Sequence, residues 1–360
     1  MNPAFATITL FLLAGLLFLA PLLPAFVELH RKRDAQPLDV IQQYGGDIRH
    51  FAHGFRGLAM GLQPELQQCV ASGTTATGSL PNGDDYVLLG LADESFFLPA
   101  TKKDLTWPSV VAAGVDLVLP DGLTFAKEIY AAGNLTGGAR STFRAILGEK
   151  SVRLQRASNV IRWAHAAHLL HAEQDCHLYG RISSDREIQL QSGCVFQRVN
   201  APLIISGFSD ARAGALAPQH SNAVDDLPAP FPPGRILYDG DLEIRAGEVV
   251  AGSIVTRGKL HIGSGARILG SAKSNAHMTV DSGASVEGSL VSGTTIHVGT
   301  NCRIGGPVLA ERGMVIESGT HCGTASMPTT VGTLTIELEE GVLVFGTIWA
   351  RNEGRVVRRA

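Results

Sequence analysis

The sequence has few aromatic and few charged side chains, which make up 6% and 18% of its 360 residues. Glycine, in contrast, occurs 41 times. Helical globular domains seldom have this composition, whereas elongated β structures with many tight turns often do. The net charge is −3 and no basic stripe with interleaved aromatic residues is present, so the composition gives no sign of a nucleic-acid partner.

Motifs for catalysis are also missing. The chain contains no Walker loop, no GxSxG elbow and no HExxH pair. Its cysteines are odd in number and form no CxxC pair, which argues against a disulfide framework or a zinc module and favours free thiols. They are Cys69, Cys176, Cys194, Cys302 and Cys322.

The densest group of potential metal ligands lies in the stretch WAHAAHLLHAEQDCH. Its members are His165, His168, His171, Cys176 and His177. Histidine and cysteine both bind zinc, but this spacing matches no zinc module. We therefore expect partly buried or surface histidines here, and we expect no metal or other cofactor.

Residues 2–27 form one long uncharged run, NPAFATITLFLLAGLLFLAPLLPAFV. About 20 apolar residues suffice to cross a bilayer. The basic cluster at 30–33 follows the run instead of preceding it, which disfavours the alternative of a cleaved signal peptide. By the positive-inside rule, the sequence predicts a single-pass anchor over 1–29 in the inner membrane, with the rest of the chain in the cytoplasm. The central anchor residues are Leu10, Phe11, Leu12, Leu16, Leu17, Phe18 and Leu19.

The region 30–67 contains an amphipathic stripe, with apolar residues alternately three and four apart. They are Ile41, Tyr44, Ile48, Phe51, Phe55, Leu58 and Leu62. The pattern predicts a juxtamembrane helix, for which three arrangements remain open. The helix lies on the inner leaflet, pairs with a second copy of itself, or packs on the domain that follows.

The C-terminal third repeats every 18 residues. The stretches LHIGSGARILG from 260, MTVDSGASVEG from 278 and IHVGTNCRIGG from 296 align without a gap. Each begins with an apolar–polar–apolar step, which is typical of a three-residue strand with one buried face. After an insertion of two residues, Leu334 and Ile336 continue the two apolar columns.

Glycine columns separate these strands. The first column holds Gly or Asn, as a corner with positive φ requires; its members are Gly247, Gly265, Gly283, Asn301 and Gly319. A second column comprises Gly252, Gly270, Gly288 and Gly306. Apolar columns divided by such corners describe a coil with three short faces, stacked ~4.8 Å from the next. The sequence therefore predicts an all-β solenoid over 235–350.

The middle of the chain is less regular. Residues 68–120 contain short strands between turn residues and predict a small α/β or β region. Residues 121–207 carry a looser repeat, spaced about 15 to 20 residues apart, which predicts irregular coils. Residues 208–234 contain five prolines and predict a linker, around which the two solenoid sections could stack end to end.

At its repeat columns, the chain resembles the bactofilins, the polymer-forming cytoskeletal proteins of bacteria. The resemblance covers about 235–350 and is carried by Leu260/Ile262, Met278/Val280 and Ile296/Val298, with Gly265, Gly270, Gly283 and Gly288. It implies a right-handed β-helix that polymerises end to end without nucleotide, often at the membrane, and organises cell-envelope enzymes or cell shape. The membrane span and the additional N-terminal region depart from this family pattern, and an added section could cap one end.

The last coil carries large apolar residues before a basic tail at 351–360. An open solenoid end leaves unpaired strand edges, which are templates for further pairing. The large residues either plug the end of the core, as terminal repeats usually do, or pair with another subunit. The candidates for self-association are Val342, Val344, Phe345, Ile348 and Trp349. We expect the tail to be solvated.

A left-handed β-helix acyltransferase acting on an envelope sugar is the alternative interpretation, because its coils also have 18 residues. Its hexapeptide pattern needs an aliphatic residue every six positions, but Ser274, Ser292 and Ala310 occupy every third slot. It also needs a histidine base, whereas His261 and His297 lie in an outward column. We therefore predict a non-enzymatic, membrane-anchored scaffold that binds copies of itself, the membrane and cell-envelope synthesis proteins.

Overall fold

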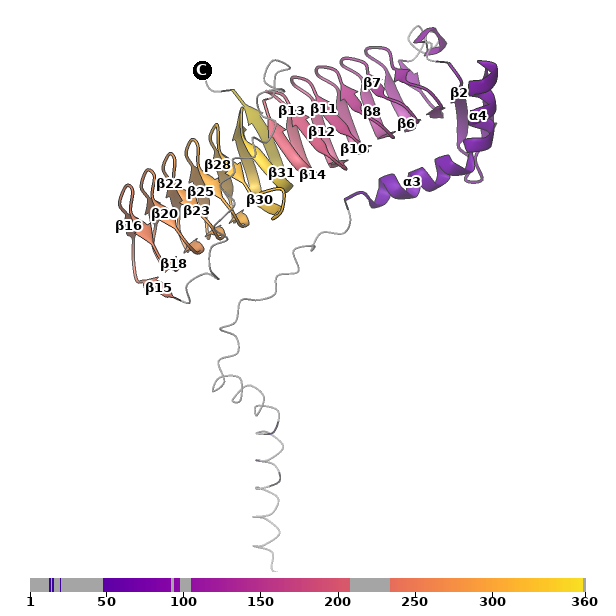
Figure 1. The fold of residues 1–360 in the computed structure, drawn as a ribbon. Helices are drawn as coiled ribbons and strands as arrows, with labels where there is room; N and C mark the ends of the chain where they lie inside the picture. Colours follow the sequence, from indigo (N-terminus) through magenta and orange to yellow (C-terminus); the bar gives the residue numbers. More distant parts are fainter. Residues whose placement is uncertain are drawn as a thin grey trace, which may run out of the picture. The chain divides into compact units, whose positions relative to one another are not determined.

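The computed structural model describes residues 13, 15, 20, 48–91, 94–97, 105–207 and 234–358. The chain divides into two units, 1–46 and 47–360. The second unit is a β-solenoid of about 13 coils with two helices, which confirms the predicted solenoid (Figure 1). Within the described residues, no helix has both the length and the apolar character needed to cross a membrane. The predicted anchor residues, Leu10, Phe11, Leu12, Leu16, Leu17, Phe18 and Leu19, lie outside the described residues.

Two helices and a hairpin precede the first parallel coils. Helix α3 (His50–Gly61) and helix α4 (Gln63–Ser72) are followed by an antiparallel pair, β1 (Thr75–Ser79) and β2 (Asp85–Leu89). A 3-10 turn, η3, spans Glu94–Phe97. Strand β2 then pairs in parallel with β4 (Val110–Ala113), so the coils already begin within 68–120. The described strands from β2 onward therefore belong to the solenoid.

The N-terminal half stacks one long and one short strand in most of its coils. The long strands are β6 (Thr124–Ala131), β8 (Thr142–Gly148), β10 (Asn159–Ala166), β12 (His177–Ser184) and β14 (Val195–Ser206). The short strands are β3 (Thr106–Trp107), β5 (Leu117–Val118), β7 (Leu135–Gly137), β9 (Val152–Leu154), β11 (Leu169–Ala172) and β13 (Glu187–Leu190).

Coil length in this half is nearly constant. The first paired residues of the strands stacked on one another in successive coils are Thr106, Thr124, Thr142, Asn159, His177 and Val195. The steps along the chain from each partner to the next differ by one position at most. Between β13 and β14 the step falls to 16, so the observed steps lie within the range of about 15 to 20 that the sequence suggested, but they vary less. Backbone pairing between strands maintains a nearly constant coil length, although the side chains in this half do not repeat.

The C-terminal half has three short strands per coil, as predicted, except for its last two strands, which have 11 and 15 residues. They are β15 (Arg235–Tyr238), β16 (Leu242–Ile244), β17 (Val249–Val250), β18 (Ser253–Thr256), β19 (Leu260–Ile262), β20 (Arg267–Ile268), β21 (Ala272–Ser274), β22 (Met278–Val280), β23 (Ser285–Val286), β24 (Leu290–Ser292), β25 (Thr295–Val298), β26 (Arg303–Ile304), β27 (Val308–Ala310), β28 (Gly313–Ile316), β29 (His321–Cys322), β30 (Thr329–Glu339) and β31 (Leu343–Val357).

The register of the last coil differs from the sequence alignment. Up to that coil, the backbone partners follow the sequence repeat through Leu242, Leu260, Met278, Ile296 and Met314. Met314 then pairs with Ile336, so the placement of Leu334 in this column is wrong by two positions. A shift of two leaves every side chain on its own face of the strand, so the alternating pattern alone does not define this register.

One corner of the coil has a positive φ in both halves. In the C-terminal half, Gly247, Gly265, Gly283, Asn301 and Gly319 have φ between 56° and 74°, which confirms the predicted corner column. The same corner in the N-terminal half is formed by Leu105, Gly122, Arg140, Ala157, Asp175 and Gly193, with φ between 52° and 79°. Four of these six residues are not glycine, which explains why the corner is hard to see in that part of the sequence.

The two halves join through an antiparallel pair, β14 with β31. The other edge of β31 pairs with β30, so both edges of this strand are occupied. Across the junction, Val199 faces Ile348, and Gly354 leaves room for the ring of Phe196. A Cβ at position 354 would lie only 2.1 Å from that ring. The buried side chains consequently form one cluster that runs through both halves. Residues 351–357 belong to β31, on which Arg351 and Arg355 are exposed.

Candidate functional site

The coil that begins the C-terminal half is open on one side. Its strands β15, β16 and β17 pair with β18, β19 and β20 of the next coil. Within the described residues, no strand pairs with their opposite edges. Three strand edges at this end therefore expose backbone donors and acceptors that another chain could satisfy.

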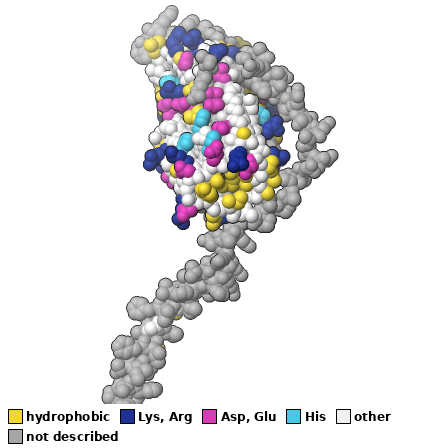
Figure 2. Space-filling view, turned by 90° about the vertical axis from the view of Figure 1, so that its left-hand side faces the viewer, with side chains coloured by type: hydrophobic (Ala, Val, Ile, Leu, Met, Phe, Trp, Pro, Cys, Tyr) yellow, Lys and Arg dark blue, Asp and Glu magenta, His cyan; other side chains and the backbone are white. Residues whose placement is uncertain are grey.

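Core-facing side chains are exposed at the same end. Ile236 continues the column of Ile254, which is buried, yet Ile236 itself is 44% exposed because no further coil covers it. Tyr238, in the column of buried Thr256, is 47% exposed. Figure 2 faces this end and shows hydrophobic side chains gathered beside charged ones. The solenoid core therefore reaches the surface here.

Sequence reasoning missed this end because it looked for an open coil at the C-terminus. A signal for it was present, since Ile236 lies one full period before Ile254 and extends that apolar column by one row. The stretch RILYDGD therefore belongs to the repeat and is its first row. The open coil is the first of the C-terminal half, not the last.

The opposite end of the solenoid is covered. The β1–β2 hairpin and helix α4 lie there, and Leu66 of α4 is fully buried. Phe97 of η3 is also fully buried and contacts Trp107 and Phe125, with ring centroids 4.9 and 5.6 Å apart. Apolar side chains from outside the coils thus close this end of the core.

The residues predicted for self-association lie at the junction inside the chain. Val342, Val344 and Ile348 are buried between β14 and the adjoining coil, so they neither plug a free end nor face a second copy. Phe345 is half-buried in a small cluster with Ile205 and Leu343. Trp349 is 40% exposed and lies under the guanidinium of Arg198, 4.6 Å from the ring centroid. The structure uses this strand within the chain.

Helix α3 packs on the outer face of the N-terminal half, the third of the arrangements considered for the amphipathic stripe. Ala52 and Ala59 are buried against the sheet, and the Phe55 ring contacts Trp163 at 5.7 Å. The helix covers a second apolar cluster, outside the coils, that includes Ala112, Tyr130, Ala145 and Leu147. This face of the sheet therefore accepts an amphipathic helix.

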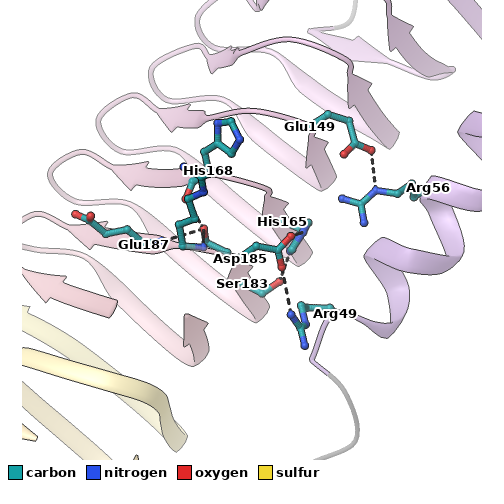
Figure 3. Close-up of polar contacts among 10 residues, drawn as sticks. Arg49, Arg56, Glu149, His165, His168, Ser183, Asp185 and Glu187 are labelled. Atoms are coloured by element: carbon teal, nitrogen blue, oxygen red, sulfur yellow. Dashed lines mark hydrogen bonds and ion pairs between the residues drawn. The ribbon is translucent and has the colours of Figure 1, made fainter. Parts of the chain in front are cut away.

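Polar contacts hold the start and the middle of α3 against the coils (Figure 3). Arg49 Nη1 lies 3.2 Å from Asp185 Oδ1, and Arg56 Nε lies 2.7 Å from Glu149 Oε1. Both pairs are partly exposed, so each contributes at most about 1 kcal/mol. They set where the helix sits, whereas apolar burial supplies most of its stability.

His165 lies fully buried beneath this helix, between Ser183 and Asp185. Its Nδ1 is 2.9 Å from Ser183 Oγ, and its Nε2 is 3.5 Å from Asp185 Oδ2. Burial lowers the pKa of His165, and the nearby Asp185 carboxylate opposes this effect only in part. Burial thus favours the neutral imidazole, and its Nε2 atom has no hydrogen-bond partner among the described residues.

Serine, histidine and aspartate in this arrangement have the composition of a hydrolytic triad. Ser183 is only 1% exposed, however, because the sheet and α3 enclose it. A nucleophile must reach a substrate carbonyl, and this hydroxyl cannot. The cluster therefore acts in helix docking. Sequence reasoning missed it because its members lie on neighbouring coils and are far apart along the chain.

The histidine-rich stretch does not converge on one point. His168 is exposed, His171 Nε2 is 2.9 Å from Gln191, His177 Nδ1 is 3.1 Å from the Tyr179 hydroxyl, and Cys176 lies in the core. The part of the chain that the structure describes contains no His, Cys, Asp and Glu group able to hold a metal ion.

All five cysteines are buried and unpaired. Burial raises the pKa of the Cys322 thiol to about 12, and burial also raises the pKa of Cys302. A buried thiol with a raised pKa is a poor nucleophile, because the thiolate is the reactive form. These cysteines therefore pack as small apolar groups.

The histidines considered for acyl transfer lie on the open outer face of the C-terminal half. His261 Nε2 is 2.9 Å from Asp281 Oδ2, and His297 Nε2 is 2.8 Å from Glu317 Oε1. Each pair joins two successive coils on the rod surface. Neither histidine lines the hollow found on this half, which lies over β21, β24 and β27.

The chain matches no known protein in three comparisons. No family model matches it, no curated protein matches it, and no solved structure matches it. The function is therefore argued from the geometry described above.

Proposed function

We propose that this protein is a structural scaffold that self-associates through the open coil at β15–β17, while its N-terminal segment anchors it in the inner membrane. One observation carries the proposal: the solenoid core reaches the surface at one end, with Ile236 and Tyr238 about half exposed. Unpaired strand edges and exposed core side chains together favour pairing with another chain. No catalytic residue takes part.

The junction inside the chain supplies a precedent for this pairing. There, the last strand of one stack of coils meets the last strand of another in antiparallel order, and both cores continue across it. We infer the same antiparallel arrangement for β15 with β15 of a second copy. Such a contact is isologous, because the same surface is used by both partners.

The proposal favours closed pairs over filaments. The described end at β1–β2 is covered by α4 and η3, and both edges of β31 are occupied. Within the described residues, the outer edges of β1, β3 and β5 also carry no paired strand, but Leu66 and Phe97 close the core behind them, so β15–β17 is the end where strand edges and core side chains are exposed together. In this respect the proposal differs from end-to-end polymers of the bactofilin type, which the repeat columns resemble.

The membrane and cell-envelope roles extend the proposal. The uncharged run at 2–27 and the basic residues after it support an inner-membrane anchor with the solenoid in the cytoplasm. A rigid rod tethered to the membrane can position envelope-synthesis proteins along its length. The outward columns of the coils offer the surface for such contacts.

Sedimentation velocity of the full-length protein in mild detergent tests the proposal. Ile236→Glu places a charge on the open end, and Ile161→Glu is the matched control, since Ile161 is 53% exposed on β10. We expect two chains per particle for the natural sequence and for Ile161→Glu, and one chain for Ile236→Glu. A single chain in every case would refute self-association. Pairs that persist in Ile236→Glu would show that the contact lies elsewhere.

A further inference from the structure

One outward-facing column of side chains runs along the whole rod. Through successive registers it comprises Glu128, Ala145, Trp163, Arg181, Arg198, Trp349, Gly332, Leu309, Val291, Lys273, Val255 and Leu237. The two halves of the solenoid therefore share one continuous outer face, although they meet in antiparallel order.

Helix α3 occupies the N-terminal part of this face and follows the coils step by step. Phe51 lies under Arg181 of β12, Phe55 meets Trp163 of β10, and Arg56 pairs with Glu149, just after β8. Just after α3, Gln63 at the start of α4 donates a hydrogen bond from its Nε2 to the Tyr130 hydroxyl of β6, at 3.1 Å. A helical turn rises ~5.4 Å and coils are spaced ~4.8 Å, so each turn of a helix can meet one coil.

The C-terminal part of the same face has no helix on it within the described residues, and it is hollowed. A depression of about 420 Å³ lies over β21, β24 and β27. It is lined by the column residues Lys273, Val291 and Leu309 and by Asn275, Ser292, Gly293, Ala310 and Glu311. Leu309 is 39% exposed and Val291 is half-buried, so these two side chains offer apolar contact within a largely polar lining.

We propose that this depression binds an amphipathic helix of a partner protein, laid along the rod as α3 is laid on the other half. Continuity with the α3 interface selects a helix, because the same column and the same coil spacing already hold one. The inference names a partner class for the proposed scaffold, yet it does not depend on self-association at β15.

Two charged residues that line the depression, Lys273 and Glu311, indicate which charges a fitting helix carries. Lys273 lies on β21 and Glu311 directly follows β27, two coils away, a separation of about 10 Å that corresponds to two helical turns. A fitting helix carries an acidic residue near Lys273 and a basic residue about seven positions away, near Glu311. Apolar residues of the helix at intervals of three and four face Val291, on the coil between them, and Leu309, on the same coil as Glu311.

Fluorescence anisotropy with a designed peptide tests the inference. The probe is an alanine-based helix of five turns with one leucine per turn on one face, and a glutamate and an arginine seven positions apart beside it. The control peptide has the same composition with its leucines scattered around the helix. We expect the full-length protein to bind the probe and not the control peptide.

Variants locate the binding. We expect Leu309→Glu to weaken binding of the probe by at least about tenfold, because an apolar contact at the centre of the interface is replaced by a charge. Val118→Glu, on an exposed residue of β5, should leave it unchanged. Absence of binding, or binding that Leu309→Glu does not alter, would overturn the inference. Sedimentation of the same samples reports self-association separately, so failure of either proposal is distinguishable.

Discussion

Replacing Gly283 with alanine should destabilise the solenoid through backbone strain alone. Gly283 has φ +72° at the corner before β23, and no atom lies within 4 Å of the position that a Cβ would take. The left-handed conformation costs an L-residue ~1–2 kcal/mol. Alanine also lowers the entropy of the unfolded chain, which offsets about 0.4–1 kcal/mol of that cost. We therefore expect a net loss of about 1 kcal/mol in the free energy of unfolding.

Two matched substitutions separate strain from steric overlap. Ala157→Gly is the reverse change at the equivalent corner of the N-terminal half, where Ala157 has φ +56°, and it should raise stability by up to about 1 kcal/mol. Gly270→Ala acts differently, because its Cβ would lie 2.5 Å from the carbonyl carbon of Gly252 in the coil beneath. Overlap with backbone cannot relax through a side-chain rotation, so this loss should exceed that of Gly283→Ala.

Urea unfolding followed by circular dichroism measures all three changes as shifts of the midpoint at unchanged slope. The expected order of midpoints is Ala157→Gly highest, then the natural sequence, Gly283→Ala and Gly270→Ala. An unchanged midpoint for Gly283→Ala, or a lower one for Ala157→Gly, would refute the assignment of this corner.

Three further predictions concern α3 and the junction. Because burial lowers the pKa of His165, the unfolded chain binds a proton before the folded chain does as the pH falls below about 6.5. The urea midpoint should therefore fall between pH 7 and 5, and it should fall less in His165→Gln. An equal fall of the midpoint in both proteins would contradict this. Ser206→Ala removes the acceptor, 3.0 Å away, of the Val342 amide at the junction and should cost about 1–3 kcal/mol in thermal unfolding; an unshifted transition would argue against a joined core. Arg56→Ala should cost under about 1 kcal/mol and speed hydrogen exchange in α3 more than elsewhere.

The C-terminal half could be read from the sequence because its backbone demands and its side chains repeat together. Gly or Asn stands at every corner from 247 to 319, and the second glycine column has a steric reason, since a Cβ at Gly270 or Gly288 would touch the coil beneath. The N-terminal half keeps the same corner with Arg140, Ala157 and Asp175. Without glycine, the corner leaves no mark in the sequence, which is why the coils there looked irregular.

The junction could not be found from periodicity. Strands β14 and β31 pair although they are far apart in the sequence, and antiparallel stacking of two coil stacks creates no new repeat. The large apolar residues after 341 set the last coil apart from the others. The pattern did not show that this coil pairs with another part of the same chain. The helix-docking cluster at His165 was equally hidden, because it depends on how α3 lies across three coils.

Disulfide trapping at Leu237 tests self-association through β15 most directly. All five natural cysteines are buried, so Leu237→Cys introduces a thiol at a residue that is 70% exposed near the middle of β15. Antiparallel pairing brings opposite Cα atoms to about 4.5–5.5 Å, which suits a disulfide. Under mild oxidation, Leu237→Cys should form a covalent pair of chains, whereas Ile161→Cys should remain monomeric on a non-reducing gel. Equal cross-linking of the two variants, or none at Leu237→Cys, would contradict the proposed contact.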